Sequence, residues 1–559
     1  MSDVTAKKEE RRKFQAIRGV RDLVSPETAL WNRVEQTAHE VFSTFGYGEI
    51  RLPIFEPTEL FARAVGGETD IVAKEMFSVE DGQGFGNLQD MQESMDFVNA
   101  QNSPILMEKY LKELTIELEA GGIAKAQENQ DAIAIIRSIS QELLAIPEPS
   151  EEGSEEAALE RFFEYVNLRK PYEKKLLESW LQLRKKEAMS LRPEATASVC
   201  RAYIEHNMQQ LPQPVKLYYM GPMFRRERPQ KGRYRQFYQI GAEVLEAIPD
   251  DVLKRLRAFD KTETEKQLTR DAAIDAEVIE MLMTFFDKVG LQGATLYINS
   301  IGHNADNCRR GYVAELKAAL EKVKDQLGAD SQRRIDTNPL RVLDSKLESE
   351  QAIVATLPCI VDHLCDECKT HYAAVKRQLE LRGVLYQENW RLVRGLDYYM
   401  RTTFEITAPG LGSQNAVCGG GRYDGLVELL GGPPTKGIGF AIGEDRLILS
   451  LQESGKGQVR QGRDVYIAWM GERAYAAAVH AAKDLRKAGF SVELPPVEQK
   501  FAKALGQADK LGAKYALILG DNEVSEGLWT LKTLSTGEQA KFPEPDLLEF
   551  LRQQKKASS

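Results

Sequence analysis

Arginine side chains crowd the segment from Tyr218 to Phe237, which reads YYMGPMFRRERPQKGRYRQF. It holds five arginines and one lysine around a proline and glycine turn, and its flanking strand-like runs predict a hairpin. A guanidinium binds phosphate through two parallel charge-assisted hydrogen bonds, and neighbouring aromatic rings stack on bases. The segment therefore predicts a loop that holds a nucleotide and touches RNA, although a solvated basic hairpin would give the same pattern.

Carboxylate, hydroxyl and amide groups flank this loop. Upstream, Glu194 and Thr196 follow Pro193 at a rigid turn where a helix is predicted to begin, so they could serve only as a helix cap. Downstream, Gln239 and Glu243 have the spacing of one helical face, or of one side of a strand. Beside a phosphate-binding loop these groups would suit a substrate ammonium, and an exposed polar face is the alternative.

Two further segments carry candidate chemistry. Residues 392–405 (LVRGLDYYMRTTFE) place Arg394 after an apolar strand start, and Tyr398 and Tyr399 before another strand-like run. An arginine there could offset the charge that develops at a phosphorus centre, where catalysis gains most, although structural arginines are common. The glycine run in residues 418–425 (CGGGRYDG) permits close approach of the backbone to a ligand.

Length and composition limit the class of protein. A chain of 559 residues predicts two to four domains, and its longest apolar runs fall far short of the roughly 20 residues of a membrane span. The charged N-terminal residues lack the apolar stretch of a secretory signal, and six cysteines do not form a dense disulfide framework. A cytoplasmic location without a membrane is expected. The net charge of -10 confines any RNA site to a local basic groove.

The spacing of apolar residues and of turn residues predicts the helices and strands that must position these side chains. A helix is predicted from Ser25 to near Gly46, followed by a strand at residues 49–53. The Glu- and Gln-rich residues 82–187 predict a separate helical insertion. Beyond a polar linker, strand-like runs alternate with amphipathic helices, which predicts a small α/β domain with a largely parallel sheet; the runs are residues 465–469, 491–494, 515–519 and 529–534.

Together these segments resemble the histidyl-tRNA synthetase family. The resemblance spans nearly the whole chain apart from the insertion and the termini. The three class II motifs resemble residues 45–53, 219–243 and 437–446, and the two histidine-specific motifs resemble residues 392–405 and 418–425. Ala195 stands where glycine is usual and Asp445 where glutamate is usual, and neither departure removes a predicted ligand group.

The resemblance implies an α+β catalytic domain with the class II synthetase antiparallel sheet, plus a helical insertion and a C-terminal α/β anticodon-binding domain. The implied catalytic domain has three parts: residues 1–81 with the first motif, residues 188–300 with the second motif, and residues 389–453 with the remaining motifs. Between these parts lie the helical insertion, residues 82–187, and a family-type inserted α/β domain, residues 301–388. A linker, residues 454–462, leads to the anticodon-binding domain, residues 463–559.

The resemblance also implies a reaction and its residues. ATP with Mg²⁺ would activate L-histidine as an adenylate, and histidine would pass to the 3′ end of tRNA(His), in a homodimer built through residues 45–53. Arg394 and Arg225 would be catalytic. The histidine-binding residues would be Glu194, Thr196, Arg225, Gln239, Glu243, Arg394, Tyr398 and Tyr399. The ATP-binding residues would be Arg225, Glu227, Arg233, Phe237 and Arg446, with Phe237 and Arg446 on either side of the adenine.

Cysteines in the predicted inserted domain raise the question of a metal. Cys365 and Cys368 have a zinc-ligand spacing, and Cys359, His363 and His371 are near in sequence. A lone pair at this spacing, without a clear second pair, is a weak signal, and similar cysteines occur without metal in this family. No metal site is predicted.

Two other classes of function compete with the synthetase. A catalytically inactive paralogue that regulates histidine biosynthesis by joining an ATP phosphoribosyltransferase would lack the C-terminal domain and lose motif residues, and an RNA-binding sensor would lose ATP residues. Arg225, Arg394 and Arg446 are all present, and residues 463–543 resemble an anticodon-binding domain. The insertion could cover the mouth of the active site, touch the tRNA acceptor arm, or be a peripheral bundle.

Overall fold

The computed structural model describes residues 14–66, 69, 71–79, 138, 142, 145, 164, 167–168, 188–412, 415–457 and 462–558. Nearly all of the predicted insertion, and part of the predicted linker, lie outside these residues, so both stay predictions. The chain divides into two compact units, residues 1–21 with 38–450, and residues 22–37 with 451–559. None of the described helices is long and apolar enough to cross a membrane.

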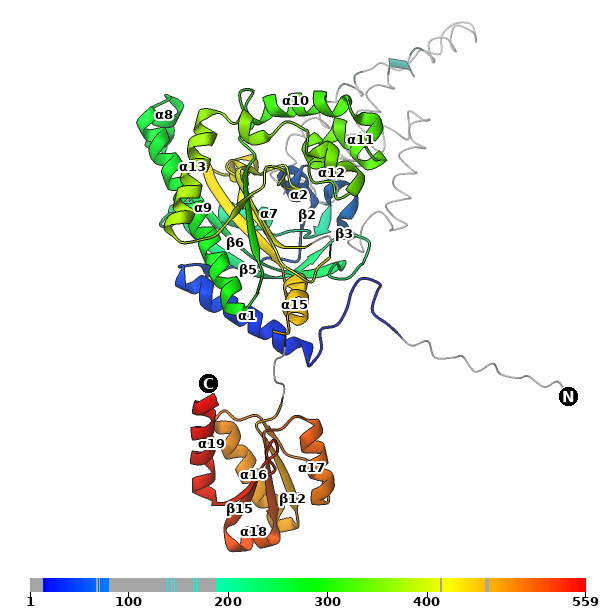
Figure 1. The fold of residues 1–559 in the computed structure, drawn as a ribbon, viewed down its shortest axis with the longest axis vertical. Coiled ribbons are helices and arrows are strands. Elements are labelled where there is room, and N and C mark those ends of the chain that lie inside the picture. The colour runs from blue at the N-terminus through cyan, green and yellow to red at the C-terminus, as the bar shows by residue number, and fades with distance from the viewer. Residues whose placement is uncertain are drawn as a thin grey trace, which may run out of the picture. The chain divides into compact units, whose positions relative to one another are not determined.

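The larger unit is built on an eight-stranded sheet in the order β1-β5-β6-β11-β10-β9-β7-β8 (Figure 1). The six central strands are antiparallel neighbours, and the two edge strands pair in parallel. The predicted antiparallel class II sheet is thus confirmed. The strands are β1 (Gly48–Glu49), β5 (Val215–Phe224), β6 (Gln236–Ala247), β7 (Thr295–Ser300), β8 (Gln387–Glu388), β9 (Met400–Thr407), β10 (Ala416–Arg422) and β11 (Thr435–Gly443).

The predicted arginine hairpin is confirmed, because β5 and β6 pair from Val215 opposite Leu245 to Phe224 opposite Gln236. The strand predicted at residues 49–53 is shorter than expected and ends at Glu49. Arg192 explains the difference. Its guanidinium donates to the carbonyls of Leu52 and Pro53 at 2.8 and 3.1 Å, so these carbonyls bind a side chain instead of a neighbouring strand.

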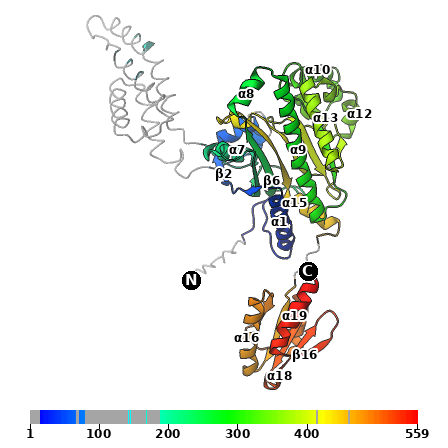
Figure 2. The same cartoon turned by 90° about the vertical axis from the view of Figure 1, so that its left-hand side faces the viewer.

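Helices α9 (Lys261–Val289) and α13 (Asp366–Leu381) lie side by side against the sheet (Figures 1 and 2). The Asp260 side chain caps α9 by accepting from the Glu263 N–H at 3.2 Å, and Gly290 ends it in the left-handed conformation. The first helix is α1 (Glu27–Thr44), as predicted, and its Phe42 packs against Tyr218. Shorter helices complete this region, α8 (Asp250–Arg257), α14 (Leu426–Leu429) and α15 (Glu444–Glu453).

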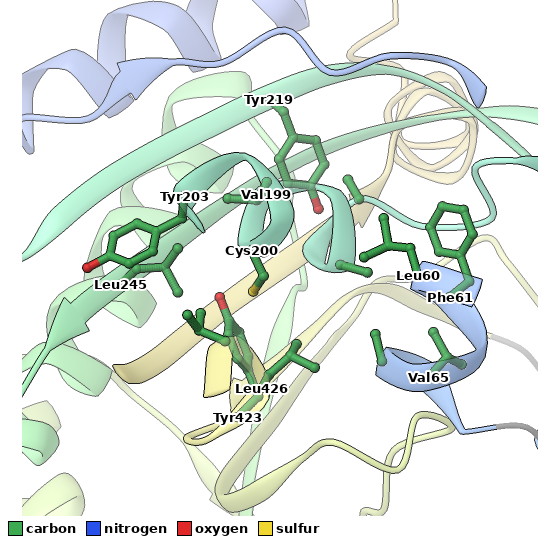
Figure 3. Close-up of a cluster of buried hydrophobic side chains, with 14 of the residues drawn as sticks. Leu60, Phe61, Val65, Val199, Cys200, Tyr203, Tyr219, Leu245, Tyr423 and Leu426 are labelled. Atoms are coloured by element: carbon green, nitrogen blue, oxygen red, sulfur yellow. The ribbon is translucent and has the colours of Figure 1, made fainter. Parts of the chain in front are cut away.

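A second, three-stranded sheet lies beside α2 (Thr58–Val65) and α7 (Thr196–Glu205), in the order β2 (Phe55–Pro57), β4 (Met189–Leu191) and β3 (Phe77–Val79). The short π-helix η1 (Ile71–Glu75) lies between α2 and β3 in the chain. The predicted helix at Thr196 is confirmed as α7. Figure 3 shows the apolar cluster in which α2 and α7 pack against the large sheet, with Phe61, Cys200 and Tyr423 fully or nearly fully buried.

Residues between β7 and β8 form mainly helices, and their core also includes Val393 and Tyr399 from the segment after β8. The side chains of Tyr312, Leu316, Ile335 and Val354 are buried there. The elements are α10 (Arg309–Glu321), α11 (Ala329–Thr337), α12 (Glu348–Val354) and the short 3₁₀ helices η4 (Lys324–Gln326), η5 (Pro339–Val342) and η6 (Ile360–His363). Another 3₁₀ helix, η3 (Met208–Gln210), follows α7 in the larger unit.

The smaller unit contains a five-stranded sheet in the order β13-β12-β14-β15-β16. The prediction of a largely parallel sheet is wrong for two of its pairings, since β14 with β15 and β15 with β16 are antiparallel. A parallel crossover needs about a dozen residues, but only the 6-residue α18 and Gly527 join β14 to β15. The elements are β12 (Val465–Met470), α16 (Glu472–Lys487), β13 (Val492–Glu493), α17 (Phe501–Lys510), β14 (Tyr515–Gly520), α18 (Asp521–Glu526), β15 (Leu528–Thr533), β16 (Gln539–Pro543) and α19 (Glu544–Ser558).

Buried charges join α9 to the large sheet. Asp275 on α9 is fully buried and accepts from Arg422 of β10 at 3.1 Å and from Thr402 of β9 at 2.6 Å. His371 of α13 lies 3.3 Å from the same carboxylate, and Asp424 pairs with Arg422 at 2.8 Å. Although burial opposes ionisation, Arg422 holds the pKa of Asp275 below its usual value. The helix layer is therefore attached to the sheet by paired charges as well as by apolar contact.

Asp275→Asn should destabilise the protein by about 3 kcal/mol, because it leaves the buried Arg422 charge without its main partner. Urea unfolding followed by tryptophan fluorescence measures this change. The matched control is Asp336→Asn, which breaks the exposed pair with Lys317 and should leave the unfolding midpoint unchanged. Equal midpoints for the two variants would contradict the role given to Asp275.

Candidate functional site

A cavity of about 830 Å³ opens on the large sheet, lined from the arginine loop, the start of α7, residues 394–399, strands β6, β10 and β11, and α15. Eleven of the twelve site residues predicted from the sequence line it. They are Glu194, Thr196, Arg225, Glu227, Arg233, Phe237, Gln239, Arg394, Tyr398, Tyr399 and Arg446. The twelfth, Glu243, lies behind the cavity wall, 1% exposed.

The arginine loop places guanidinium groups and an aromatic ring at one side of the cavity. Arg225 directly follows β5, and its guanidinium lies 5.3 Å from the centre of the Phe237 ring. Its Nε donates to the Pro193 carbonyl at 2.9 Å, which fixes the side chain. Glu227 is 3.2 Å from Arg233 and 3.8 Å from Arg225. This side of the cavity therefore offers fixed positive charge next to a flat apolar surface.

Glu194 both lines the cavity and caps a helix. Its two carboxylate oxygens accept from the N–H groups of Thr196 and Ala197 at 2.7 and 3.0 Å. Glu194 therefore does cap the helix, which was the predicted alternative to a binding role, and its carboxylate also faces the cavity. Burial raises the pKa of Glu194, and the two N–H groups oppose that rise.

Glu243 joins three parts of the chain beneath the cavity. Its carboxylate accepts from Thr196 Oγ1 at 2.7 Å and from the Tyr423 hydroxyl at 2.6 Å. Gly439 on the neighbouring strand leaves the space it needs, since a Cβ there would lie 1.7 Å from Glu243 Oε2. Burial raises the pKa of Glu243 to about 8, and Glu194 adds to the rise.

Arg394 is held between a carboxylate, an aromatic ring and a glycine. It donates to Glu405 at 3.2 Å, and its guanidinium lies 5.8 Å from the centre of the Tyr399 ring. A Cβ at Gly419 would lie 2.2 to 2.4 Å from the guanidinium atoms. The glycine run was expected to let the backbone approach a ligand; at Gly419 it makes room for Arg394 itself. Burial opposes the charge, but Tyr399 and Glu405 keep the pKa of Arg394 above its usual value.

The tyrosine pair and an amide form another part of the wall. The rings of Tyr398 and Tyr399 lie 4.6 Å apart, and Tyr398 meets Tyr423 edge-on at 5.7 Å. Gln239 lies on β6, and its buried Oε1 has no hydrogen-bond partner among the described residues. A buried amide oxygen without a partner costs free energy, so this atom is suited to accept from a polar ligand.

Several functional residues were not predicted. Tyr423 and Glu405 hold Glu243 and Arg394 in place. Both lie inside the motif segments. The sequence pattern there does not distinguish a tyrosine or an acid that supports a cavity residue from one that would contact a ligand. Arg334, Arg341 and Lys346 line the same cavity from the helical region between β7 and β8. No sequence signal identifies these three, because only the fold brings them to the site.

Asp445, the residue that replaces the usual glutamate of the third motif, has a positioning role. Its carboxylate accepts from the Tyr238 N–H at 2.9 Å and pairs with Arg21 at 3.1 Å. It therefore ties the start of α15 to β6 and to the N-terminal segment, beside the neighbouring Arg446 in the cavity wall.

Comparison with known families defines the class of protein. The model of the class II tRNA synthetase core domain (G, H, P, S and T) matches residues 179–438. The anticodon-binding domain model matches residues 464–554. These matches agree with the antiparallel sheet and the separate C-terminal unit, and the chain carries a class II tRNA synthetase core.

Individual relatives narrow the class to one family. The histidine–tRNA ligase of Koribacter versatilis (strain Ellin345) is 42% identical over 539 residues, which cover 96% of each chain. That of Solibacter usitatus (strain Ellin6076) is 41% identical and covers 96% of this chain and 98% of its own. The crystal structure of apo histidyl-tRNA synthetase from S. aureus superposes with a TM-score of 0.61 at 29% identity, over 96% of this chain and 100% of its own. The chain belongs to the histidine–tRNA ligase family.

The raised pKa of Glu243 makes a testable contribution to stability. Its folded-state pKa of about 8 lies above the unfolded value, so this contribution is fully present below about pH 4.3 and is lost as pH rises through 8. Within that window one proton is released on unfolding, which gives a slope of about 1.4 kcal/mol per pH unit.

Glu243→Gln cannot titrate, so it should remove this slope from the unfolding free energy between pH 5 and pH 8. Thermal unfolding of both proteins across that range measures the difference. Identical pH dependence in the wild type and the variant would show that Glu243 is not held protonated.

Proposed function

We propose that this chain is a histidine–tRNA ligase, which activates L-histidine with ATP and transfers it to tRNA(His). One observation carries the proposal: a single cavity unites the guanidinium groups of Arg225, Arg233, Arg394 and Arg446 with the polar wall around Gln239 and the tyrosine pair. The guanidinium groups suit the phosphates of ATP, and the polar wall suits a small zwitterion with a ring.

In the first step the histidine carboxylate attacks the α-phosphorus of ATP, and pyrophosphate leaves in line with the attack. The phosphorus–oxygen bond to the carboxylate forms as the bond to pyrophosphate breaks, giving histidyl-adenylate. No protein nucleophile is needed, so catalysis comes from positioning and from charge placed in advance. Arg225 and Arg394 supply that charge, because each is already fixed by a hydrogen bond to the protein.

Arg394 contacts the reacting carboxylate and the α-phosphate in this proposal, and Phe237 and Arg446 enclose the adenine. The carboxylates of Glu227 and Glu405 line the cavity and are hard oxygen donors, which suit Mg²⁺ bound together with phosphates. When bound, Mg²⁺ would neutralise phosphate charge. The positions of Glu227 and Glu405 themselves are set by their arginine partners.

The ammonium is common to all amino acids, so histidine is selected by the groups that a different side chain would leave unpaired. Glu194 and Thr196 take the ammonium, and Gln239 accepts from the substrate through its unpartnered oxygen. Glu243 acts from behind the wall by fixing Thr196, with Tyr398 and Tyr399 closing the pocket. A polar pocket that stays unpaired rejects wrong substrates strongly, an argument for which the tyrosyl enzyme is a known illustration. Editing is therefore not required.

In the second step the 3′-terminal ribose hydroxyl of tRNA(His) attacks the adenylate carbonyl, and AMP leaves. Residues 463–559 bind the anticodon end in this proposal, which rests on the match of residues 464–554 to the anticodon-binding model. The six cysteines carry no disulfide, which suits a cytoplasmic enzyme.

Arg394→Ala should lower histidine-dependent ATP–pyrophosphate exchange by about 10²- to 10³-fold, because one contact to transition-state charge is lost. Arg394→Lys should restore little, since lysine lacks the planar fork. The matched control is Arg391→Ala, three positions away and outside the cavity, which should exchange normally. Near-normal exchange by a folded Arg394→Ala protein would contradict the proposed chemistry, and testing all twenty amino acids would show whether histidine alone is activated.

A homodimer is part of the proposal. Residues 45–53 contain β1, the strand at one edge of the large sheet, and the adjoining Ile54 and Phe55 are 46% and 55% exposed. Exposed apolar side chains beside a sheet edge suit a two-fold interface. Light scattering should give the mass of two chains, and Phe55→Asp should shift the protein towards one chain. Leu385→Asp, at another exposed apolar residue, should remain dimeric; a monomeric active wild type would rule the dimer out.

The insertion at residues 82–187 is proposed to be separate from the catalytic chemistry. The described strands that flank it adjoin, since Phe77 pairs with Leu191 and Val79 with Met189 in antiparallel register. Replacing residues 82–187 with a short Gly/Ser connector should therefore leave pyrophosphate exchange largely intact, with any loss in transfer to tRNA. A shortened protein that folds and dimerises but makes no adenylate would place the insertion in the catalytic site.

A further inference from the structure

Four potential metal ligands meet away from the catalytic cavity. His303 and Cys308 lie in the loop between β7 and α10, and Cys365 and Cys368 lie at the N-terminus of α13. Their donor atoms all lie within 4.8 Å of one another. None of the three cysteines is in a disulfide. We name these four residues the His303 cluster.

The distances in the His303 cluster suit a tetrahedral zinc ion. His303 Nδ1 lies 3.2 Å from Cys368 Sγ and 3.6 Å from Cys365 Sγ. At the tetrahedral angle, zinc bonds of about 2.3 Å to sulfur and about 2.0 Å to nitrogen separate nitrogen from sulfur by about 3.5 Å and two sulfurs by about 3.8 Å. Three sulfurs with one imidazole are a donor set typical of structural zinc and leave no open coordination position.

The surroundings of the cluster are those of a closed structural site. Cys308 and Cys368 are buried, and they pack with Leu364 in a small apolar cluster. Gly302 lets the loop fold tightly, because a Cβ there would lie 2.6 Å from Cys308 Sγ.

The partners expected from the sequence were not the ones that the fold assembles. His371 is buried against Asp275 at 3.3 Å, and His363 faces Glu315 at 3.5 Å. The second ligand pair comes instead from His303 and Cys308. The expectation of no metal rested in part on the lack of a second pair, and that part of the reasoning does not hold in the folded chain.

We propose that His303, Cys308, Cys365 and Cys368 bind a structural zinc ion, which fastens the loop after β7 to the start of α13. The same loop supports the catalytic cavity. Arg309, next to Cys308, donates to the Tyr399 carbonyl at 2.5 Å, and the Gly302 carbonyl accepts from the Arg401 N–H at 2.7 Å. The zinc site therefore holds the backbone on both sides of Met400, directly after the tyrosine pair.

Elemental analysis of the purified full-length protein tests this proposal. The wild type should contain about one zinc per chain, and Cys365→Ser and Cys368→Ser should retain about a tenth of that or less. The matched control is Cys359→Ser, which changes a cysteine of the same region outside the cluster and should keep its zinc. If the cluster variants fold poorly, cobalt substitution of the wild type should give the intense visible bands of tetrahedral cobalt and a thiolate-to-cobalt band in the near ultraviolet.

A wild-type protein without zinc that also fails to take up cobalt would overturn the proposal, as would equal zinc loss in Cys359→Ser. A further readout rests on the proposed function. Removing zinc from the wild type with a chelator should raise the KM for histidine more than the KM for ATP, and added zinc should reverse the change. Metal content is measured independently of activity, so failure of the zinc proposal and failure of the proposed function are distinguishable.

Discussion

Charged side chains buried on the sheet impose the constraint on which the rest of the large unit depends. A buried charge is tolerated when it is paired and hydrogen-bonded, so each one fixes the elements that carry its partners. Asp275 with Arg422 fixes α9 to β9 and β10. Glu243 is a different case, because burial raises its pKa to about 8 and favours the neutral form; its hydrogen bonds with Thr196 and Tyr423 still fix the start of α7 to the strands. The catalytic cavity is the space that these fixed elements leave between them.

Glycine on β10 and β11 makes this arrangement possible. A side chain at Gly439 would occupy the position of the Glu243 carboxylate, and one at Gly419 would occupy that of the Arg394 guanidinium. Both glycines lie in ordinary strand pairing, so the requirement is space and not an unusual backbone conformation. The motifs that contain these glycines therefore encode space for two ionisable side chains as well as the strands themselves.

The sequence predicted those features that short-range pattern or a resemblance determines. The hairpin, the helix at Thr196, the antiparallel sheet and the gathering of eleven of the twelve site residues at one cavity belong to this group. It did not predict which residues lie behind the cavity wall, because Glu243 and Gln239 occupy equivalent positions in the alternating pattern of a strand, yet only Gln239 lines the cavity. It also missed the direction of β15, which depends on the length of a connection, and the meeting of His303 with Cys368, which are joined only by long-range packing.

Helix α13 connects the proposed zinc site with the buried charge network around Asp275, both of which lie outside the cavity. Its N-terminus carries Cys365 and Cys368, and one turn further His371 packs against Asp275 in the buried charge network. Arg401 follows the tyrosine pair, and its guanidinium pairs with Glu367 of the same helix at 3.4 Å. Its N–H donates a hydrogen bond to the carbonyl of Gly302, in the loop between β7 and α10. The segment that follows Tyr399 is thus held from the helix and from the loop together. A substitution in α13 should for this reason disturb the tyrosine pair of the proposed histidine pocket more than it disturbs the arginine loop between β5 and β6.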